Sequence, residues 1–470
     1  MAKAQGAETA TPGAGRTRVK KWSRREGDSE SRHVSRSALT HPPRIFQPSH
    51  FYMPMKLTIA SIFITYLFAA LLSPFPYWKT YFLLLRTVLF NRSACLPTSA
   101  KWTQIKFLLK QVIYNPFWVL LWYLDELFFS GYRQIQVNPV FIVGQPRCGT
   151  TLLHRTLAAD SQSFFAIRHI EWRYPYILVQ KLLKLTGIEK KINRKNYWPE
   201  NDIGRLAAKM HPNTLADWEE DGIFFEERFL HHFFIFLRFP YPHLVDSLEQ
   251  FESLPNHVRQ QMLDVHQKVI QKVAYIRGQP QACYLSKEVT SHAKIPDLIA
   301  RYPTARFLIV VRPAVDYMSS LMGLMRTSTC AKTGVDAIAV PGWKEAFLKR
   351  MREDSFLLIR ICREVIPPER QIPVAGNYLI EHILETVKMI FQSLDLHPDS
   401  AFIDALAILD RKQHERKKGY DYDAIELIGF EDFDQFVHCV EKDFFSLLPT
   451  VKNGNDSGLA KPSWSGDDAM

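Results

Sequence analysis

A short loop between an expected strand and an expected helix is the part of this sequence best suited to chemistry. The β-branched and aromatic run from Val140 to Val143 is followed by Gly144. Thr150 and Thr151 then open a segment whose leucines have helical spacing. A strand that turns through small residues into a helix start leaves backbone N–H groups free beside the positive end of the helix dipole. The sequence therefore predicts an anion site, of the kind that usually holds a phosphate.

The loop differs from the ATP-binding pattern G-x-x-x-x-G-K-[ST]. Gly144 and Gly149 have the required spacing, but Thr150 replaces the lysine, and the cation comes earlier, at Arg147. The letters P-R-C-G-T-T-L-L instead resemble the 5′-phosphosulfate loop of sulfotransferases that use 3′-phosphoadenosine 5′-phosphosulfate (PAPS). They are closest to the branch of that family that reads P-R-S-G-T-T.

The resemblance implies a role for each loop residue. Gly149, Thr150 and Thr151 would hold the 5′-phosphate. Arg147 would bind the cofactor and act in catalysis, over the bridging oxygen of the phosphosulfate. Cys148 belongs to the same predicted cofactor-binding set, but it stands where the family usually has serine, so its contact is weaker.

A second anion motif follows about 160 residues later. The apolar run 305–311 predicts a buried parallel strand that ends at Arg312, and Ser320 lies on the helix expected after it. An arginine at a strand end and a serine in the first turns of the next helix can converge on one phosphate. By the resemblance, Arg312 and Ser320 bind the 3′-phosphate that distinguishes PAPS from ATP.

The acceptor half of the site is expected between the two motifs. The segment 211–225, HPNTLADWEEDGIFF, resembles in part a family segment with a histidine-proline start and an acidic cluster. We take Glu220 as the catalytic base, with Glu219 and His211 as alternatives. The acidic cluster could also be a solvated helix start, which the helix dipole favours.

Lys287 follows the strand-like run 283–285, and His292 lies five residues later. The resemblance gives Lys287 a catalytic role in stabilising the transferring sulfuryl group or the leaving phosphate. The alternative is a surface lysine at a strand end. The reaction needs a base and cations, and no metal.

The positive charge lies mainly in the N-terminal tail. Residues 1–56 hold eleven Lys/Arg and four acids, so +7 of the total +11 belongs to them. The remaining chain is close to neutral, which argues against a nucleic-acid partner for the folded part.

Residues 57–72 are an uncharged apolar run of sixteen residues, about 24 Å long as a helix. With flanking aromatic residues they predict a signal-anchor over 51–90, with the lipid bilayer as a partner. Because positive residues precede this run, we expect a type II Golgi membrane protein, with a lumenal catalytic domain and glycosylation at Asn91 and Asn455. If 57–90 form a hairpin, the protein instead faces the cytosol. Residues 113–129 predict an interfacial or packed helix.

The alternation of strands and helices predicts an α/β fold, a P-loop-like open parallel sheet flanked by helices, with ligands at the carboxyl ends of the strands. The expected organisation is a disordered basic tail (1–50), a membrane anchor (51–90), an aromatic connecting region (91–138), a sulfotransferase domain (139–440) and a flexible C-terminal tail (441–470).

The leading function is therefore transfer of a sulfuryl group from PAPS to an acceptor hydroxyl. A P-loop kinase would instead need magnesium. A glycosyltransferase is suggested by Asp421-Tyr422-Asp423 and would need manganese. A non-catalytic membrane scaffold on the same fold is the remaining alternative. The acceptor is left open.

Overall fold

The computed structural model describes residues 52–72, 77–92, 94–279, 283–289, 292–415 and 423–445. The predicted N-terminal tail, residues 446–470 of the predicted C-terminal tail, and Asp421 and Tyr422 lie outside these ranges. The chain divides into a small unit, Met1–Ile59, and a large unit, Ala60–Met470, which contains every predicted site residue.

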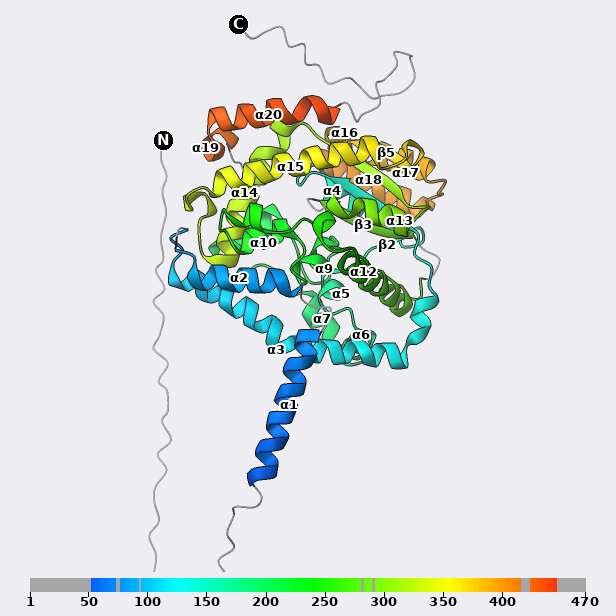
Figure 1. The fold of residues 1–470 in the computed structure, drawn as a ribbon. Coiled ribbons are helices and arrows are strands. Elements are labelled where there is room, and N and C mark those ends of the chain that lie inside the picture. Colours follow the sequence, from blue (N-terminus) through cyan, green and yellow to red (C-terminus); the bar gives the residue numbers. More distant parts are fainter. Residues whose placement is uncertain are drawn as a thin grey trace, which may run out of the picture. The chain divides into compact units, whose positions relative to one another are not determined.

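Five parallel strands form the sheet at the centre of the large unit (Figure 1). Their order is β2-β3-β1-β4-β5. Every residue of β1 is buried, as its run of apolar side chains predicts for an inner strand of a parallel sheet. The strands are β1 (Pro139–Gly144), β2 (Phe164–Phe165), β3 (Cys283–Val289), β4 (Arg306–Val311) and β5 (Gln371–Ala375).

Helices flank this sheet, so the predicted α/β class is confirmed (Figure 1). Two of the long helices end at a glycine in the left-handed conformation, Gly278 after α12 and Gly334 after α14, a common way to stop a helix. The helices after β1 are α4 (Thr150–Ala158), α5 (His169–Arg173), α6 (Ile177–Leu185), α7 (Ile188–Asn193), α8 (Asp202–Met210), α9 (Gly222–Glu226), α10 (His232–Arg238), α11 (Leu244–Ser247), α12 (Asn256–Arg277), α13 (Ile295–Arg301), α14 (Ala314–Thr333), α15 (Trp343–Glu364), α16 (Gly376–Glu381), α17 (Ile383–Ser393), α18 (Ser400–His414), α19 (Ala424–Ile428) and α20 (Phe430–Phe445).

One strand boundary differs from the sequence expectation. β3 continues past the expected 283–285 to Val289, so Lys287 lies within the strand. β5 ends at Ala375, because Gly376 already begins α16.

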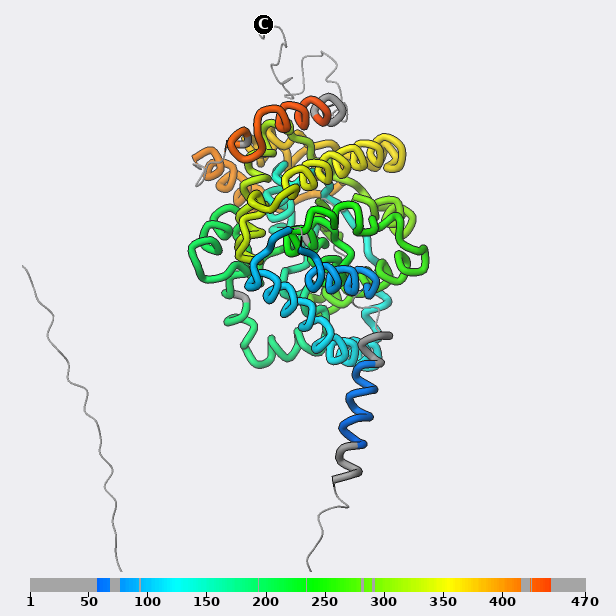
Figure 2. Tube along the Cα trace, turned by 60° about the vertical axis from the view of Figure 1, so that its left-hand side comes forward, coloured from blue at the N-terminus to red at the C-terminus, as the bar shows by residue number. Residues whose placement is uncertain are grey.

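Three helices precede the sheet: α1 (Tyr52–Leu72), α2 (Trp78–Phe90) and α3 (Thr98–Phe128). The predicted span 57–72 lies in α1, and among the described residues we find no helix that is both long and apolar enough to cross a membrane. α2 and α3 pack side by side, as both views of the chain show (Figures 1 and 2).

The end of α3 is fixed to the sheet-containing part by a buried ion pair. Asp125 accepts hydrogen bonds from the backbone N–H groups of Ile177 (2.7 Å) and Leu178 (3.0 Å), at the start of α6. It also accepts one from Lys272 Nζ at 3.1 Å, and burial lowers the pKa of Lys272 to about 8. Residues 113–128 of the segment 113–129 thus belong to α3, which is packed on the side that carries Asp125.

Candidate active site

The predicted anion loop joins β1 to α4 at the carboxyl edge of the sheet. Gly149 has a φ of 98° and Arg147 a φ of 71°, so the chain makes two left-handed steps before α4 begins. A side chain at Gly144 would place its Cβ 2.6 Å from the Val310 carbonyl oxygen. Glycine is thus required where the loop leaves β1 against β4. The tight turn directs the start of α4 and the loop toward one cavity.

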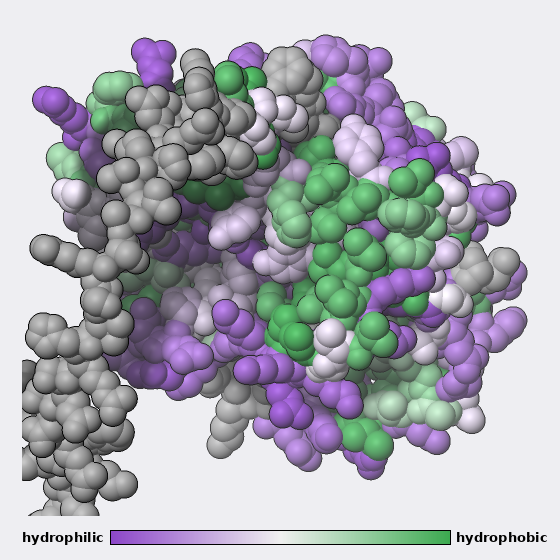
Figure 3. All heavy atoms as spheres, turned by 90° about the horizontal axis from the view of Figure 1, so that it is seen from below, coloured by the Kyte–Doolittle hydropathy of each residue, from purple (hydrophilic) through white to green (hydrophobic). Residues whose placement is uncertain are grey.

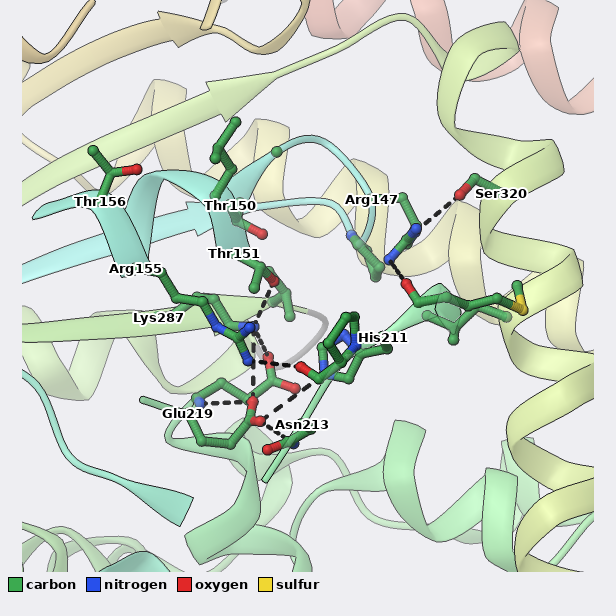
Figure 4. Close-up of a pocket in the computed structure, with 18 of the residues that line it drawn as sticks. Arg147, Thr150, Thr151, Arg155, Thr156, His211, Asn213, Glu219, Lys287 and Ser320 are labelled. Atoms are coloured by element: carbon green, nitrogen blue, oxygen red, sulfur yellow. Dashed lines mark hydrogen bonds and ion pairs between the residues drawn. The ribbon is translucent and has the colours of Figure 1, made fainter. Parts of the chain in front are cut away.

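The second anion motif meets the loop because β4 lies next to β1. Arg147 Nε donates to Ser320 Oγ at 2.9 Å, as Figure 4 shows, and Arg312 Nη1 donates to the Arg147 carbonyl oxygen at 3.1 Å. The structure therefore brings Arg147, which the sequence analysis assigned to the phosphosulfate, into contact with the corner formed by Arg312 and Ser320, which it assigned to the 3′-phosphate.

Asn377 is a member of this corner that the sequence analysis missed. Its Oδ1 accepts a hydrogen bond from Arg312 Nε at 2.7 Å, and its Nδ2 donates to Asp316 at 2.5 Å. Asn377 follows β5, the strand beside β4, and so it reaches Arg312 only through the fold. Asn377 therefore holds the Arg312 guanidinium in place through Nε. The bonds of Arg312 to Asn377 and to Arg147 use Nε and Nη1, and Nη2 takes part in neither.

Lys287 and two glutamates form another wall of the cavity, and Figure 4 labels Lys287 and Glu219. Lys287 Nζ is 3.1 Å from Thr151 Oγ1, 3.3 Å from Glu220 Oε2 and 3.9 Å from Glu219 Oε1. All three charged side chains are buried. Lys287 thus connects the anion loop with the acidic segment, and it is not a surface lysine.

The two glutamates have different environments. Glu219 accepts hydrogen bonds from Asn213 Nδ2 and from the Glu220 backbone N–H, and its Oε2 lies 3.9 Å from His211 Nε2. Burial alone would raise the pKa of Glu219, but His211 and Lys287 lower it well below its usual range. Glu219 is therefore a fixed anion.

Glu220 has the properties expected of a base. Its buried Oε2 forms an ion pair with Lys287 Nζ at 3.3 Å and accepts no well-aligned hydrogen bond from the described residues. Burial raises the pKa of Glu220 to about 7; the charge of Lys287 opposes this shift and that of Glu219 adds to it. A carboxylate with a pKa near neutral pH is well matched to proton abstraction.

Buried contacts hold the acidic segment in position. Asp221 accepts hydrogen bonds from Tyr284 OH at 2.7 Å and from His266 Nε2 at 2.8 Å. The backbone N–H of Glu219 donates to the Ile167 carbonyl oxygen at 3.0 Å. The solvated acidic helix start considered from the sequence is therefore not what the chain forms, because these carboxyl groups are buried.

Two other sequence candidates take supporting positions. The Cys148 thiol is buried away from the cavity, and burial raises its pKa to about 12, so only its backbone belongs to the loop. His292 is also buried, with Nε2 3.3 Å from the Gly144 carbonyl oxygen at the end of β1. In the described ranges, no cluster of three or more His, Cys, Asp or Glu side chains has the arrangement of a metal site.

These walls surround a cavity of about 790 Å³. Gly149, Thr150 and Thr151 line it at the loop, Arg312 and Ser320 at the strand–helix corner, and Glu219, Glu220 and Lys287 opposite. Arg155, Thr156 and Asn213 also line the cavity and were not singled out in the sequence. The volume is in the range of small-molecule and cofactor sites.

The sequence of residues 139–400 matches the Sulfotransferase family, and the chain belongs to this family. The resemblance drawn from the loop is therefore confirmed at the level of the family. No curated protein matches the chain in sequence.

Solved structures of bacterial sulfotransferases have a similar fold. Sulfotransferase STF1 of Mycobacterium tuberculosis is 17% identical, with a TM-score of 0.52 over 79% of this chain and 92% of that one. STF9 of Mycobacterium avium is 14% identical, with a TM-score of 0.56 over 76% and 88% of the two chains. At these identities the likeness concerns the fold.

Proposed function

We propose that this protein transfers a sulfuryl group from PAPS to an acceptor hydroxyl by in-line displacement. The observation that carries the proposal is the meeting, in one cavity, of an anion loop without the ATPase lysine, an Arg312–Ser320 corner and a buried base beside Lys287. The loop sequence P-R-C-G-T-T favours the P-R-S-G-T-T branch of the family.

Each wall has a separate task in this mechanism. The loop N–H groups with Thr150 and Thr151 bind the 5′-phosphate, and Arg312 and Ser320 bind the 3′-phosphate. Glu220 takes the proton of the acceptor hydroxyl. At the same time the oxygen of that hydroxyl bonds to sulfur, and the bond between sulfur and the bridging oxygen of the phosphosulfate breaks. Lys287, 3.1 Å from Thr151 Oγ1, stabilises the charge that develops on the leaving phosphate. No metal is needed for these steps.

The remaining lining favours an acceptor with an apolar body. Ile223, three residues after Glu220 and at the start of α9, lines the cavity. Phe233 and Leu237 of α10 line it too, with Leu324 and Met325 of α14. These two helices pack against each other. We expect transfer to 2-naphthol or cholesterol and none to glucose; preferential transfer to glucose would contradict an apolar acceptor.

The location of the enzyme remains a proposal from the sequence. The positive residues before 57–72 favour a membrane-anchored, type II Golgi protein with a lumenal catalytic domain. Glycosidase digestion of the cell-expressed protein tests it: a mass shift lost in Asn91→Gln supports the lumenal location. A cytosol-facing protein would show no glycan at either sequon.

Calorimetric titration with 3′,5′-bisphosphoadenosine, without metal, tests the cofactor site. Arg312→Ala should weaken binding roughly 10- to 150-fold, because it removes a charge-assisted hydrogen bond worth about 1.5–3 kcal/mol. Arg306→Ala, at the other end of β4, is the matched control and should bind normally.

ATP should bind more weakly than the bisphosphate, because it lacks the 3′-phosphate. Magnesium-dependent ATP binding with no affinity for the bisphosphate would favour the kinase alternative. Equal affinities in the wild type and in Arg312→Ala would overturn the assignment of this corner.

A further inference from the structure

The outer side of α3 carries an unusual stripe of exposed apolar side chains. At 100° per residue their positions fall on one side of the helix. Leu127 is 72% exposed and Tyr123 is 63% exposed, although the opposite side of α3 is packed. The stripe consists of Trp102, Leu109, Ile113, Tyr114, Phe117, Leu120, Tyr123, Leu127 and Phe128.

Neighbouring helices extend this apolar surface. α2 packs against α3 and exposes Phe82, Leu89 and Phe90; α6 also packs against α3 and, together with the start of α7, exposes Leu178, Leu182, Leu185 and Ile188. Figure 3 views the side on which α3 and α6 lie in Figure 1 and shows a broad hydrophobic patch bordered by hydrophilic side chains. We call the exposed residues of α2, α3, α6 and α7 the lower face.

The charges on the lower face have one sign. Residues 77–128 and 177–195 contain twelve Lys/Arg and three acids. None of the acids is exposed: Asp125 pairs with Lys272, Glu126 with Arg133, and Glu189 with Arg168. The exposed basic residues here include Arg86, Lys106, Lys110, Lys181 and Lys184; Lys79 is also exposed but pairs with Glu249 at 2.7 Å.

From this combination we infer that the lower face binds the surface of an anionic lipid bilayer, with α3 lying in the plane of the interface. Exposed leucines enter the acyl boundary, tryptophan and tyrosine occupy the headgroup level, and the lysines contact anionic lipid headgroups. α3 is 31 residues long, about 46 Å, so the contact extends well beyond a small apolar patch. The contact is made by the folded domain and does not require a membrane span. Because anionic lipids give the cytoplasmic leaflet its negative surface, this contact corresponds to the cytosol-facing arrangement and not to the lumenal one.

Charge decides between a bilayer and a protein partner. A second copy of this chain would oppose basic residues to basic residues, because the lower face exposes no acid within the described residues. An anionic bilayer complements both the charge and the apolar stripe, with each lysine near the surface contributing about 1 kcal/mol.

The test uses the full chain on vesicles that contain brominated lipids, which quench a fluorophore only on contact. Leu120→Cys is labelled in a Cys95→Ser variant, since Cys95 is the exposed native cysteine among the described residues. The Cys95→Ser variant without the new cysteine is treated with the same label and gives the background signal. Phe356→Cys, at an exposed apolar position of α15, is the matched control. We expect quenching at position 120 and little at 356, however the chain is otherwise attached to the vesicle.

A charge variant provides the second measurement. Combined Lys106→Gln, Lys110→Gln and Lys184→Gln should reduce the preference for phosphatidylserine over phosphatidylcholine vesicles by roughly 100-fold, about fivefold per lysine. Equal quenching at positions 120 and 356, or none at 120, would overturn the inference. An unchanged lipid preference would overturn its electrostatic basis. A lipid-free dimer that shields position 120 would show that two copies of the chain bind each other there.

Discussion

Glu220→Gln keeps the shape of the side chain and removes its ability to take a proton. With a pKa of about 7, Glu220 in the wild type is half ionised at neutral pH. The ionised fraction is about 3% at pH 5.5 and about 97% at pH 8.5. Sulfuryl transfer should therefore rise with pH through about 7. Losing the base should cost roughly 10²–10⁴ in rate, or about 3–5 kcal/mol.

Infrared difference spectroscopy follows the Glu220 carboxyl group without any acceptor. The protonated-acid band that disappears near pH 7 in the wild type and is missing from the spectra of Glu220→Gln is the band of Glu220. Burial also raises the pKa of Asp354 to about 7 and that of Glu288 to about 8, and their bands should remain in the variant. Transfer of labelled sulfuryl from PAPS to 2-naphthol then gives the corresponding rate profile. Together the two measurements relate one titrating group to the chemistry.

Two neighbouring variants should move this titration in opposite directions. Lys287→Met removes a positive charge 3.3 Å away and should raise the pKa of Glu220, whereas Glu219→Gln removes a negative charge and should lower it. A band that titrates near the ordinary glutamate value, or that disappears in Glu219→Gln instead, would refute the assignment of Glu220 as the base.

Two further predictions concern the framework of the site. Gly376→Ala places a Cβ 2.4 Å from the Cys148 carbonyl oxygen, so it should displace the anion loop. We expect it to lower stability by about 1–3 kcal/mol and to weaken binding of 3′,5′-bisphosphoadenosine, measured by thermal unfolding and calorimetry. Gly131→Ala, whose Cβ would have its nearest neighbour at 3.9 Å, is the control in both measurements. Unimpaired binding by Gly376→Ala would contradict the tight packing of the loop. Asp125→Asn leaves buried Lys272 with the more distant Glu126 Oε1, at 3.8 Å, and should destabilise the protein by about 3 kcal/mol in denaturant unfolding. A change below about 1 kcal/mol would show that the pair is not tightly buried in solution.

The sequence predicted the parts of the site that depend on local patterns. β1, the loop and α4 follow from an apolar run, glycines and helical spacing within twenty residues, and Arg312 with Ser320 follows from a second strand–helix boundary. Parallel strands then bring the two boundaries to one edge of the sheet.

Contacts between residues that are far apart in the sequence could not be predicted from such local patterns. Asn377 and Asn213 are ordinary polar residues in the sequence, and only the neighbouring strands or loops bring them to Arg312 and Glu219. The choice among Glu220, Glu219 and His211 also needed burial, because adjacent glutamates acquire different pKa values from their surroundings. The buried thiol of Cys148 could not be distinguished from an exposed one by its neighbours in the chain.

Two consecutive residues of β3, Lys287 and Glu288, carry opposite charges and point to opposite faces of the sheet. Lys287, opposite Ile142, points to the anion loop, while Glu288, opposite Val143, pairs with buried Lys294 at 2.6 Å. Exchanging the two residues by Lys287→Glu with Glu288→Lys would leave composition, net charge and local propensity almost unchanged. It would nevertheless place an anion beside the anion loop and two cations together in the interior. The composition of the segment does not change, yet strand alternation makes the exchange disruptive, because each charge moves to the opposite face of the sheet.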